Sequence, residues 1–264
     1  MPSMAPDRTP LLDRRSALRL LAGAGLVALG ACGRESSSDE APSSASTSTT
    51  PSSSECADAI PEETAGPFPG DGSNGPDVLT EDGVVRRDIR TSFGSGTGTA
   101  DGLPLEIELT IVDAAKGCAP LPGAAVYVWQ CDRTALYSLY SRGATGANYL
   151  RGVQVADADG RLAFTSVFPG AYSGRWPHIH FEVFSSLAAA RNGADPVAVS
   201  QLALSEEACR AAYATAGYAA SVRNLASTPL ARDNVFADDD GGDQLATMSG
   251  DASSGFTASL VVPV

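Results

Sequence analysis

Apolar and polar residues alternate along much of the chain after about residue 100. The segment LEIELTIVD (105–113) alternates strictly, as is typical of a strand with one buried face. Short apolar runs bounded by Gly, Pro or Asp predict further strands at 124–130, 151–157, 161–167, 178–184, 196–204 and 256–262. The bend Ala158-Asp159-Gly160 indicates a hairpin between two of them. This pattern predicts an all-β domain, specifically an antiparallel β-sandwich.

A single stretch has the pattern of a helix, SEEACRAAYATAG (205–217). Ser205 can accept hydrogen bonds from the first turn, and two glutamates follow it, next to the positive end of the helix dipole. Gly217 suits the position where a helix ends. We therefore expect one short helix near 205–217.

The first 55 residues have the composition of targeting and linker segments. Arg14-Arg15 precede an apolar stretch that ends in Leu29-Gly30-Ala31-Cys32, which resembles a twin-arginine signal with a lipoprotein cleavage site. An uncleaved anchor helix is the alternative. Residues 32–55 consist mainly of Ser, Thr, Pro, Ala and acidic residues, and we interpret them as a disordered tether, with a glycosylated stalk as the alternative. We expect a signal peptide over 1–31, a lipid on Cys32, an extracytoplasmic location at the cell surface, and one domain over 56–264.

The chain is acidic, with a formal net charge of −13 at pH 7. A negatively charged surface repels the phosphate backbone, so nucleic acid is not an expected partner.

Four cysteines remain after Cys32, namely Cys56, Cys118, Cys131 and Cys209. An even number outside the cytoplasm favours two disulfides, whose pairing the sequence leaves open.

The chain contains two histidines, His178 and His180, and both belong to one predicted strand. Side chains two residues apart on a strand point to the same face, and imidazole is the commonest side-chain metal ligand. Glu182 shares that face, so a zinc or copper site of two histidines and one glutamate is one hypothesis. Tyr172, together with Tyr137 or Tyr140, offers another, because a phenolate suits a hard, strongly acidic cation such as Fe(III).

Several motifs in order along the domain resemble the intradiol ring-cleavage dioxygenases, in particular their secreted bacterial branch. They are CADAIPEETAGPFPGDG, GCAPLPGAAVYVWQCD and YLRGVQVADADGRLAFTSVFPGAYSGRWPHIHFEV. The family pattern RxxHIH after PGxY is the most specific of them. The first motif departs from the family at Ala65 and Phe68. The resemblance implies a β-sandwich with long active-site loops.

The resemblance also implies a ligand set and a reaction. Tyr137, Tyr172, His178 and His180 would hold one non-haem Fe(3+) per chain. Tyr140 is a rival to Tyr137. The enzyme would use O2 to cleave a catechol-type aromatic diol to a cis,cis-muconate-type diacid.

Further roles follow from the same resemblance. Tyr172 would act as ligand and then as base, and Arg175 would stabilise developing negative charge. Gln201, Pro67 and Phe68 would contact the substrate. The helical dimerisation region of the cytoplasmic catechol enzymes is absent, so we expect a monomer. The alternative functions are a non-catalytic extracellular binding β-sandwich and a zinc- or copper-binding lipoprotein. The sequence does not identify the catechol.

Overall fold

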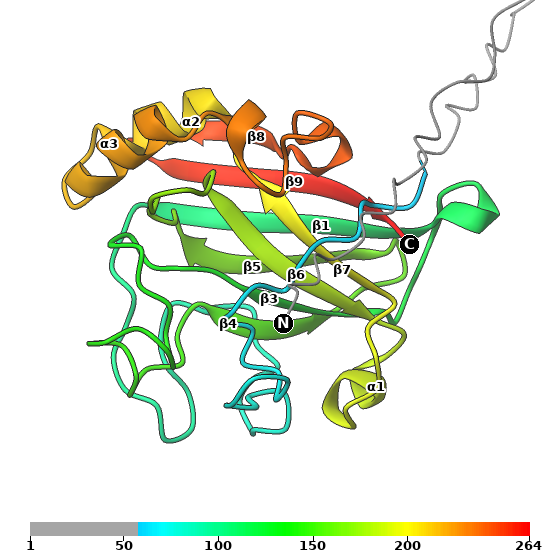
Figure 1. Ribbon diagram of the computed structural model, residues 1–264. Coiled ribbons are helices and arrows are strands. Elements are labelled where there is room, and N and C mark those ends of the chain that lie inside the picture. The colour runs from blue at the N-terminus through cyan, green and yellow to red at the C-terminus, as the bar shows by residue number, and fades with distance from the viewer. Residues whose placement is uncertain (1–57) are drawn as a thin grey trace, which may run out of the picture. The chain divides into compact units, whose positions relative to one another are not determined.

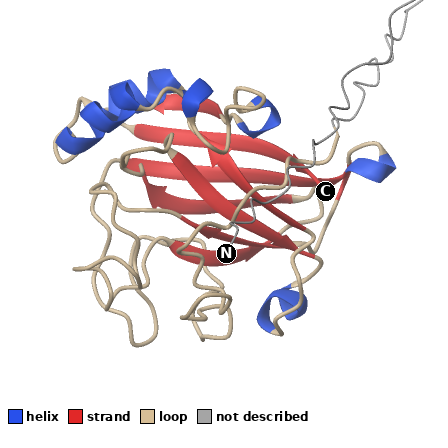
Figure 2. Ribbon diagram, viewed as in Figure 1, coloured by secondary structure: helices blue, strands red, loops and turns tan. Residues whose placement is uncertain are grey.

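The computed structural model describes residues 58–264, and in them two β-sheets pack face to face (Figures 1 and 2). The predicted signal peptide (1–31), the lipid on Cys32 and the predicted tether (32–55) lie outside the described residues. So do the first two residues of the predicted domain. No helix in the described part of the chain is long and apolar enough to cross a membrane. The predicted all-β sandwich is confirmed.

One sheet has five strands and the other has four. The first sheet contains β1 (Pro104–Asp113), β2 (Ala119–Pro120), β5 (Arg161–Val167), β8 (Thr247–Asp251) and β9 (Gly255–Pro263). The second has the order β4 (Arg151–Val155), β3 (Ala125–Trp129), β6 (His178–Phe184) and β7 (Ala198–Ala203).

The five-stranded sheet is mixed. β1 pairs in parallel with β9, while the other strand pairs of both sheets in the described residues are antiparallel. The strictly antiparallel expectation therefore fails at this one pair. β2 and β8 were not predicted, because two residues and a weakly apolar TMSGD give little pattern.

The predicted hairpin at 158–160 is wrong, although its turn forms. Gly160 N–H donates to the carbonyl of Asp157 at 3.0 Å, but β4 pairs with β3 and β5 pairs with β1. The turn thus carries the chain from one sheet to the other. Gly160 has φ 75°, and an added Cβ would clash with the carbonyl of Ile111, which fixes this corner against β1.

The sandwich core lies between the inner faces of the sheets. Alternate residues of β1 are buried there, opposite Val126, Val128, Ile179, Phe181 and Val183 of the four-stranded sheet. β3 and β6 are buried on both faces. Their outward-facing residues, among them Tyr127 and Trp129, belong to a second cluster that the segments after residue 64 and after β3 cover. This covered outer face is where polar side chains can lie away from water.

The predicted helix is confirmed as α2 (Glu206–Tyr213), with Ser205 Oγ accepting from Ala208 N–H at 3.3 Å. It ends four residues before Gly217. Two further α-helices were not predicted, α1 (Leu187–Arg191) and α3 (Ala219–Ser227). Short 3-10 turns are η1 (Ala114–Lys116), η2 (Leu230–Arg232) and η3 (Gly242–Gln244). In Figure 1, α2 and α3 lie near β8, and α1 lies at the opposite side of the domain.

Two of the four cysteines expected in disulfides are free. Cys131 and Cys209 are unpaired and buried, so the expectation of two disulfides is wrong. The Cys131 thiol donates to the carbonyl of Gly170 at 3.3 Å, and Cys209 faces the core from α2. Burial raises the pKa of both thiols, which keeps them protonated and unreactive. Cys118 is disulfide-bonded.

Candidate metal centre

The two histidines of β6 meet at their ring nitrogens on the covered outer face of the four-stranded sheet. His178 and His180 are 2% and 3% exposed, and their Nε2 atoms are 3.1 Å apart. His178 Nδ1 lies 2.5 Å from the carbonyl of Trp176. Because a carbonyl only accepts, Nδ1 carries the proton, and the Nε2 lone pair of neutral His178 points toward His180.

Two tyrosine hydroxyls complete this cluster. Tyr172 Oη lies 3.1 Å from His178 Nε2, and Tyr137 Oη lies 3.5 Å from the same nitrogen. The two hydroxyls are 3.3 Å apart. Tyr140 points elsewhere, because its hydroxyl donates to Asn74 Oδ1 and accepts from Gly70 N–H. The structure therefore assembles the set His178, His180, Tyr172 and Tyr137, and leaves Tyr140 outside it.

The loop after β3 presents Tyr137 through an unusual backbone. Ala135 and Leu139, two residues to either side, have φ of 67° and 71°, a left-handed conformation that costs side-chain-bearing residues about 1–2 kcal/mol each. Asp132 Oδ1 offsets this cost by accepting from the N–H groups of Thr134 and Leu136. Such local strain is common at functional sites.

Burial favours the neutral form of every member of the cluster. It lowers the pKa of His178 to about 3, with Arg175 adding to the effect, and lowers that of His180 well below its usual range. Burial also raises the pKa of Tyr172 to about 12 and that of Tyr137 well above its usual range. The protein alone therefore does not ionise these phenols, and a strongly acidic cation is needed to do so.

The donor set fits a ferric ion. Two imidazole nitrogens face one another at 3.1 Å with two phenol oxygens beside them. The facing nitrogens gain a shared partner when a cation binds between them, and two phenolates would balance the charge of Fe(III). Tyrosinate is an established iron ligand.

Arg175 lies beside this cluster with two of its three nitrogens occupied. Its Nε donates to Asp233 Oδ2 at 2.9 Å, and its Nη2 donates to Gln201 Oε1 at 2.6 Å. Nη1 remains 3.5 Å from His178 Nε2. Gln201, predicted to contact the substrate, is fully buried and bonds to Arg175 and to the carbonyl of Thr64.

A cavity of about 500 Å³ opens onto the cluster. Pro67 and Phe68 line it, together with Thr64, Gly66, Tyr137, Tyr172, Arg175, His180 and Asn234. The Phe68 ring centroid lies 5.0 Å from that of Tyr137. The segment 64–68, hereafter the pocket wall, thus covers the four candidate ligands Tyr137, Tyr172, His178 and His180. These four side chains are hereafter called the metal cluster. A ligand in this cavity would contact both tyrosines and Arg175.

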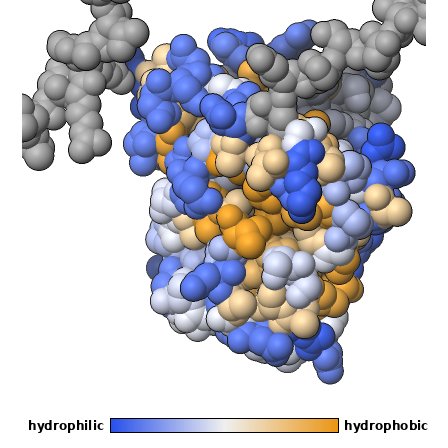
Figure 3. All heavy atoms as spheres, turned by 90° about the vertical axis from the view of Figure 1, so that its right-hand side faces the viewer, coloured by the Kyte–Doolittle hydropathy of each residue, from blue (hydrophilic) through white to orange (hydrophobic). Residues whose placement is uncertain are grey.

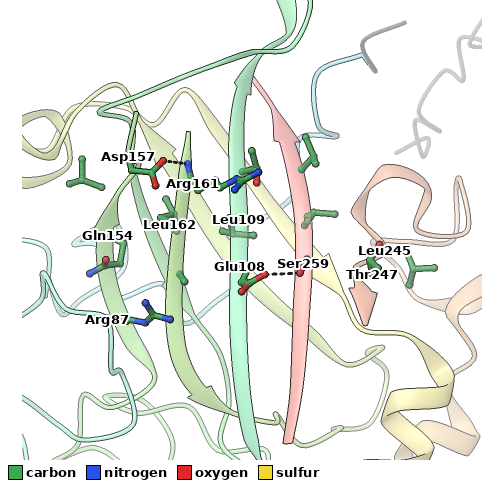
Figure 4. A pocket seen from close by; sticks show the side chains of 15 residues that line it. Arg87, Glu108, Leu109, Gln154, Asp157, Arg161, Leu162, Leu245, Thr247 and Ser259 are labelled. Carbon is green, nitrogen blue, oxygen red and sulfur yellow. Dashed lines mark hydrogen bonds between the residues drawn. The ribbon is translucent and has the colours of Figure 1, made fainter. Parts of the chain in front are cut away.

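A larger groove, of about 880 Å³, lies over β1, β5 and β9 (Figure 4). Its charged side chains, Arg87, Glu108, Asp157 and Arg161, are dispersed along the strands, and none of the predicted site residues lines it. Apolar residues also gather near the centre of the face shown in Figure 3. Neither surface has convergent groups comparable to the metal cluster.

Glu182 does not join the histidines. It lines a separate cavity of about 220 Å³ with Asp71, Asp77 and Asp195. Within residues 58–264, no group of three or more His, Cys, Asp or Glu side chains could hold a metal ion. The hypothesis of a zinc or copper site made by His178, His180 and Glu182 is therefore wrong.

The buried carboxyl of Glu182 gives a testable pH dependence. Burial, then repulsion from Asp71, raises its pKa from 4.5 to about 8. The folded state therefore holds a proton that the unfolded state releases, and stability falls as pH rises from about 4.5 to about 8. Glu182→Gln should flatten this decline, which is a relative gain of roughly 3 kcal/mol at pH 8 over pH 5 at ~1.4 kcal/mol per pKa unit. Urea unfolding at both pH values measures the gain. Parallel curves for the two proteins would contradict the expectation.

Comparison with known proteins shows what this part of the chain is similar to. A family model described as "Dioxygenase" matches residues 75–192, a range that contains all four residues of the cluster and Arg175. The fold is similar to that of an intradiol ring-cleavage dioxygenase from Tetranychus urticae, with a TM-score of 0.60 and 23% identity over 78% of this chain and 94% of that chain. Residues 75–192 match the dioxygenase family model, and the described residues have the fold of the intradiol ring-cleavage dioxygenases.

A second solved structure similar to this chain is the dioxygenase domain of a dioxygenase carbohydrate-binding protein fusion from the cellulolytic bacterium Streptomyces sp. SirexAA-E. Its TM-score is 0.50, with 22% identity over 78% of this chain and 98% of that chain. No curated protein matches the sequence.

The sequence does not single out two residues that organise the site, Asp233 and Arg151. Asp233 binds Arg175 from 58 positions further along the chain. Arg151 is fully buried and bonds to backbone carbonyls of the pocket wall and of Ser138. Nothing in the local sequence around Asp233 indicates its role. For Arg151, the position of an arginine at the start of an apolar strand is a weak indication of a buried charge.

Proposed function

We propose that this protein binds one Fe(III) through Tyr137, Tyr172, His178 and His180, and uses O2 to cleave a catechol-type diol between its hydroxylated carbons. The product is a diacid of the cis,cis-muconate type that contains both atoms of O2. The observation that carries the proposal is that two phenol oxygens and the Nε2 atom of His180 all lie within 3.5 Å of His178 Nε2. Bound Fe(III) would act as a Lewis acid that draws electron density from the diol.

Tyr172 would take a proton from the substrate. It lines the cavity, and its hydroxyl lies 3.1 Å from His178 Nε2, so a phenolate formed when iron binds would lie beside an entering diol. A catechol hydroxyl entering the cavity reaches Tyr172 together with Tyr137. We infer that Tyr172 accepts one of the two catechol protons.

Arg175 supplies the positive charge that faces the ring. Its guanidinium lines the cavity and has Nη1 directed to the metal cluster. A fixed cation in a site shielded from water stabilises negative charge that develops on the reacting ring. The apolar pocket wall of Pro67 and Phe68 excludes water from the same space.

The charges around the cavity favour diols without a carboxylate. Arg175 is the one cationic side chain among the described residues that line the cavity, and Asp233 already pairs with it at 2.9 Å. A ring carboxylate would therefore be buried without a free cation, which costs free energy. We expect catechol and hydroxyquinol to react at least tenfold faster than protocatechuate, measured as kcat/KM.

One experiment tests the function and this order. The purified protein is analysed for metals, its visible spectrum is recorded, and oxygen uptake is measured with the three diols. We expect stoichiometric iron, a red to purple colour from tyrosinate-to-Fe(III) charge transfer, and oxygen uptake with ring-opened product. A colourless protein with stoichiometric zinc and no oxygen uptake after loading with iron would overturn the proposal. Faster turnover of protocatechuate would overturn the substrate order alone.

A further inference from the structure

Asp233 is a buried carboxylate at the end of η2 that holds four donors. Its side chain is 0% exposed. Oδ2 accepts from Arg175 Nε at 2.9 Å and from Trp176 N–H at 2.6 Å. Oδ1 accepts from the N–H groups of Val235 and Phe236 at 2.8 and 3.2 Å. Burial opposes its ionisation, but these bonds from Trp176 and Arg175 keep its pKa below the usual range. Asp233 is therefore a fixed anion next to the metal cluster.

The geometry of Arg175 depends on this anion. Asp233 holds Nε and Gln201 holds Nη2, so the planar guanidinium is fixed at two of its three nitrogens. The remaining nitrogen, Nη1, lies 3.5 Å from His178 Nε2 and faces the metal cluster. The Phe236 ring, 5.8 Å from the guanidinium carbon, packs beside it. The Asp233 carboxylate therefore accepts one hydrogen bond from the Arg175 guanidinium and another from the backbone N–H of Phe236.

We propose that Asp233 is a positioning residue of the ring-cleavage reaction, which aims Arg175 Nη1 at the substrate by holding Nε. This inference rests on the proposed function. Asp233 does not line the cavity, so it acts through Arg175 and does not touch the substrate. A displacement of about 1 Å of a catalytic group can reduce the rate by about 10²-fold, and the loss of one of two fixed nitrogens permits such a displacement.

A purely structural role is the competing explanation, because Asp233 also anchors the backbone of residues 235 and 236. The two roles differ in how they depend on Arg175. A positioning effect disappears when the guanidinium is absent, whereas a backbone effect persists. A double-mutant cycle separates them.

The experiment measures kcat and KM for catechol, on iron-loaded full-length protein, in Asp233→Asn, Arg175→Met, the double variant and the unchanged chain. Thermal unfolding of each metal-free protein is recorded alongside. We expect Asp233→Asn to lower kcat roughly tenfold to hundredfold with KM changed less than threefold. In the Arg175→Met background the same substitution should change kcat less than threefold. Equal losses in both backgrounds, or no loss with Arg175 present, would overturn the inference.

Two additions keep the test decisive. If Asp233→Asn does not fold, Asp233→Glu replaces it, because this variant keeps the buried charge but moves the carboxylate by one methylene and should lose kcat in the same Arg175-dependent way. The unchanged chain provides the second check. If the unchanged chain consumes oxygen with none of the diols, the proposed function is refuted. If it is active but the effects of Asp233→Asn and Arg175→Met on kcat are additive, only the role of Asp233 is refuted.

Discussion

Tyr172→Phe should lower kcat for catechol by about 10³-fold, within the 10²–10⁴-fold range of a lost general base. The variant removes a hydroxyl that lies 3.1 Å from His178 Nε2 and 3.3 Å from Tyr137 Oη, so both a proton acceptor and a charge-balancing ligand are lost. We also expect the visible charge-transfer band to weaken and shift. Oxygen uptake and the absorption spectrum of the iron-loaded variant measure the two effects.

Tyr140→Phe is the matched control. Tyr140 also lies in the loop after β3, but its hydroxyl bonds to Gly70 and Asn74 outside the cluster. Its loss should leave kcat within threefold of the unchanged chain, while Tyr137→Phe should weaken the band as Tyr172→Phe does. An active Tyr137→Phe beside an inactive Tyr140→Phe would reassign the ligand. A fully active Tyr172→Phe would refute the role of Tyr172.

Arg151→Met should lower the free energy of unfolding by roughly 2–5 kcal/mol. Arg151 is 0% exposed, and its guanidinium donates to the carbonyls of Phe68, Pro69 and Ser138. Each buried acceptor left without a donor costs about 1–3 kcal/mol. The Pro69 carbonyl keeps a bond from Tyr127, so the cost comes mainly from the other two.

Urea unfolding followed by circular dichroism measures this loss. Arg142→Met is the control, because Arg142 is exposed in the same loop after β3 and its loss should cost within about 0.5 kcal/mol. Equal midpoints for the two variants would show that the carbonyls find other donors. The bonds of Arg151 join the pocket wall to the residue after Tyr137, so we also expect a higher KM for catechol in Arg151→Met at temperatures where it remains folded.

Most strands could be predicted because their signal is local. Alternation in 105–113 and the apolar runs at 161–167 and 178–184 each depend on the residues of one segment. Strand partners could not be predicted in the same way. The Asp157–Gly160 turn has hairpin chemistry, yet its two strands find partners in different sheets. The parallel pairing of β1 with β9 joins segments about 150 positions apart, and no local pattern encodes it.

In the candidate site, too, the residues brought together by local strand geometry could be predicted, and those placed by irregular loops could not. The two histidines are neighbours on one strand face, so strand geometry alone brings them together. The choice between Tyr137 and Tyr140 depends on left-handed residues in an irregular loop, which periodicity does not describe. Cys131 and Cys209 were assigned to disulfides from their number, but both thiols are free and buried, and that of Cys131 donates to the carbonyl of Gly170.

Both tryptophans of the chain adjoin the metal cluster. The Trp129 indole is stacked on the His180 ring, with centroids 4.9 Å apart and planes 5° apart, and the carbonyl of Trp176 accepts from His178. If the proposed Fe(III) binds the two histidines, this paramagnetic, coloured ion would quench the nearby indole emission. The intrinsic fluorescence would then report how much of the site is loaded, without a label and without turnover.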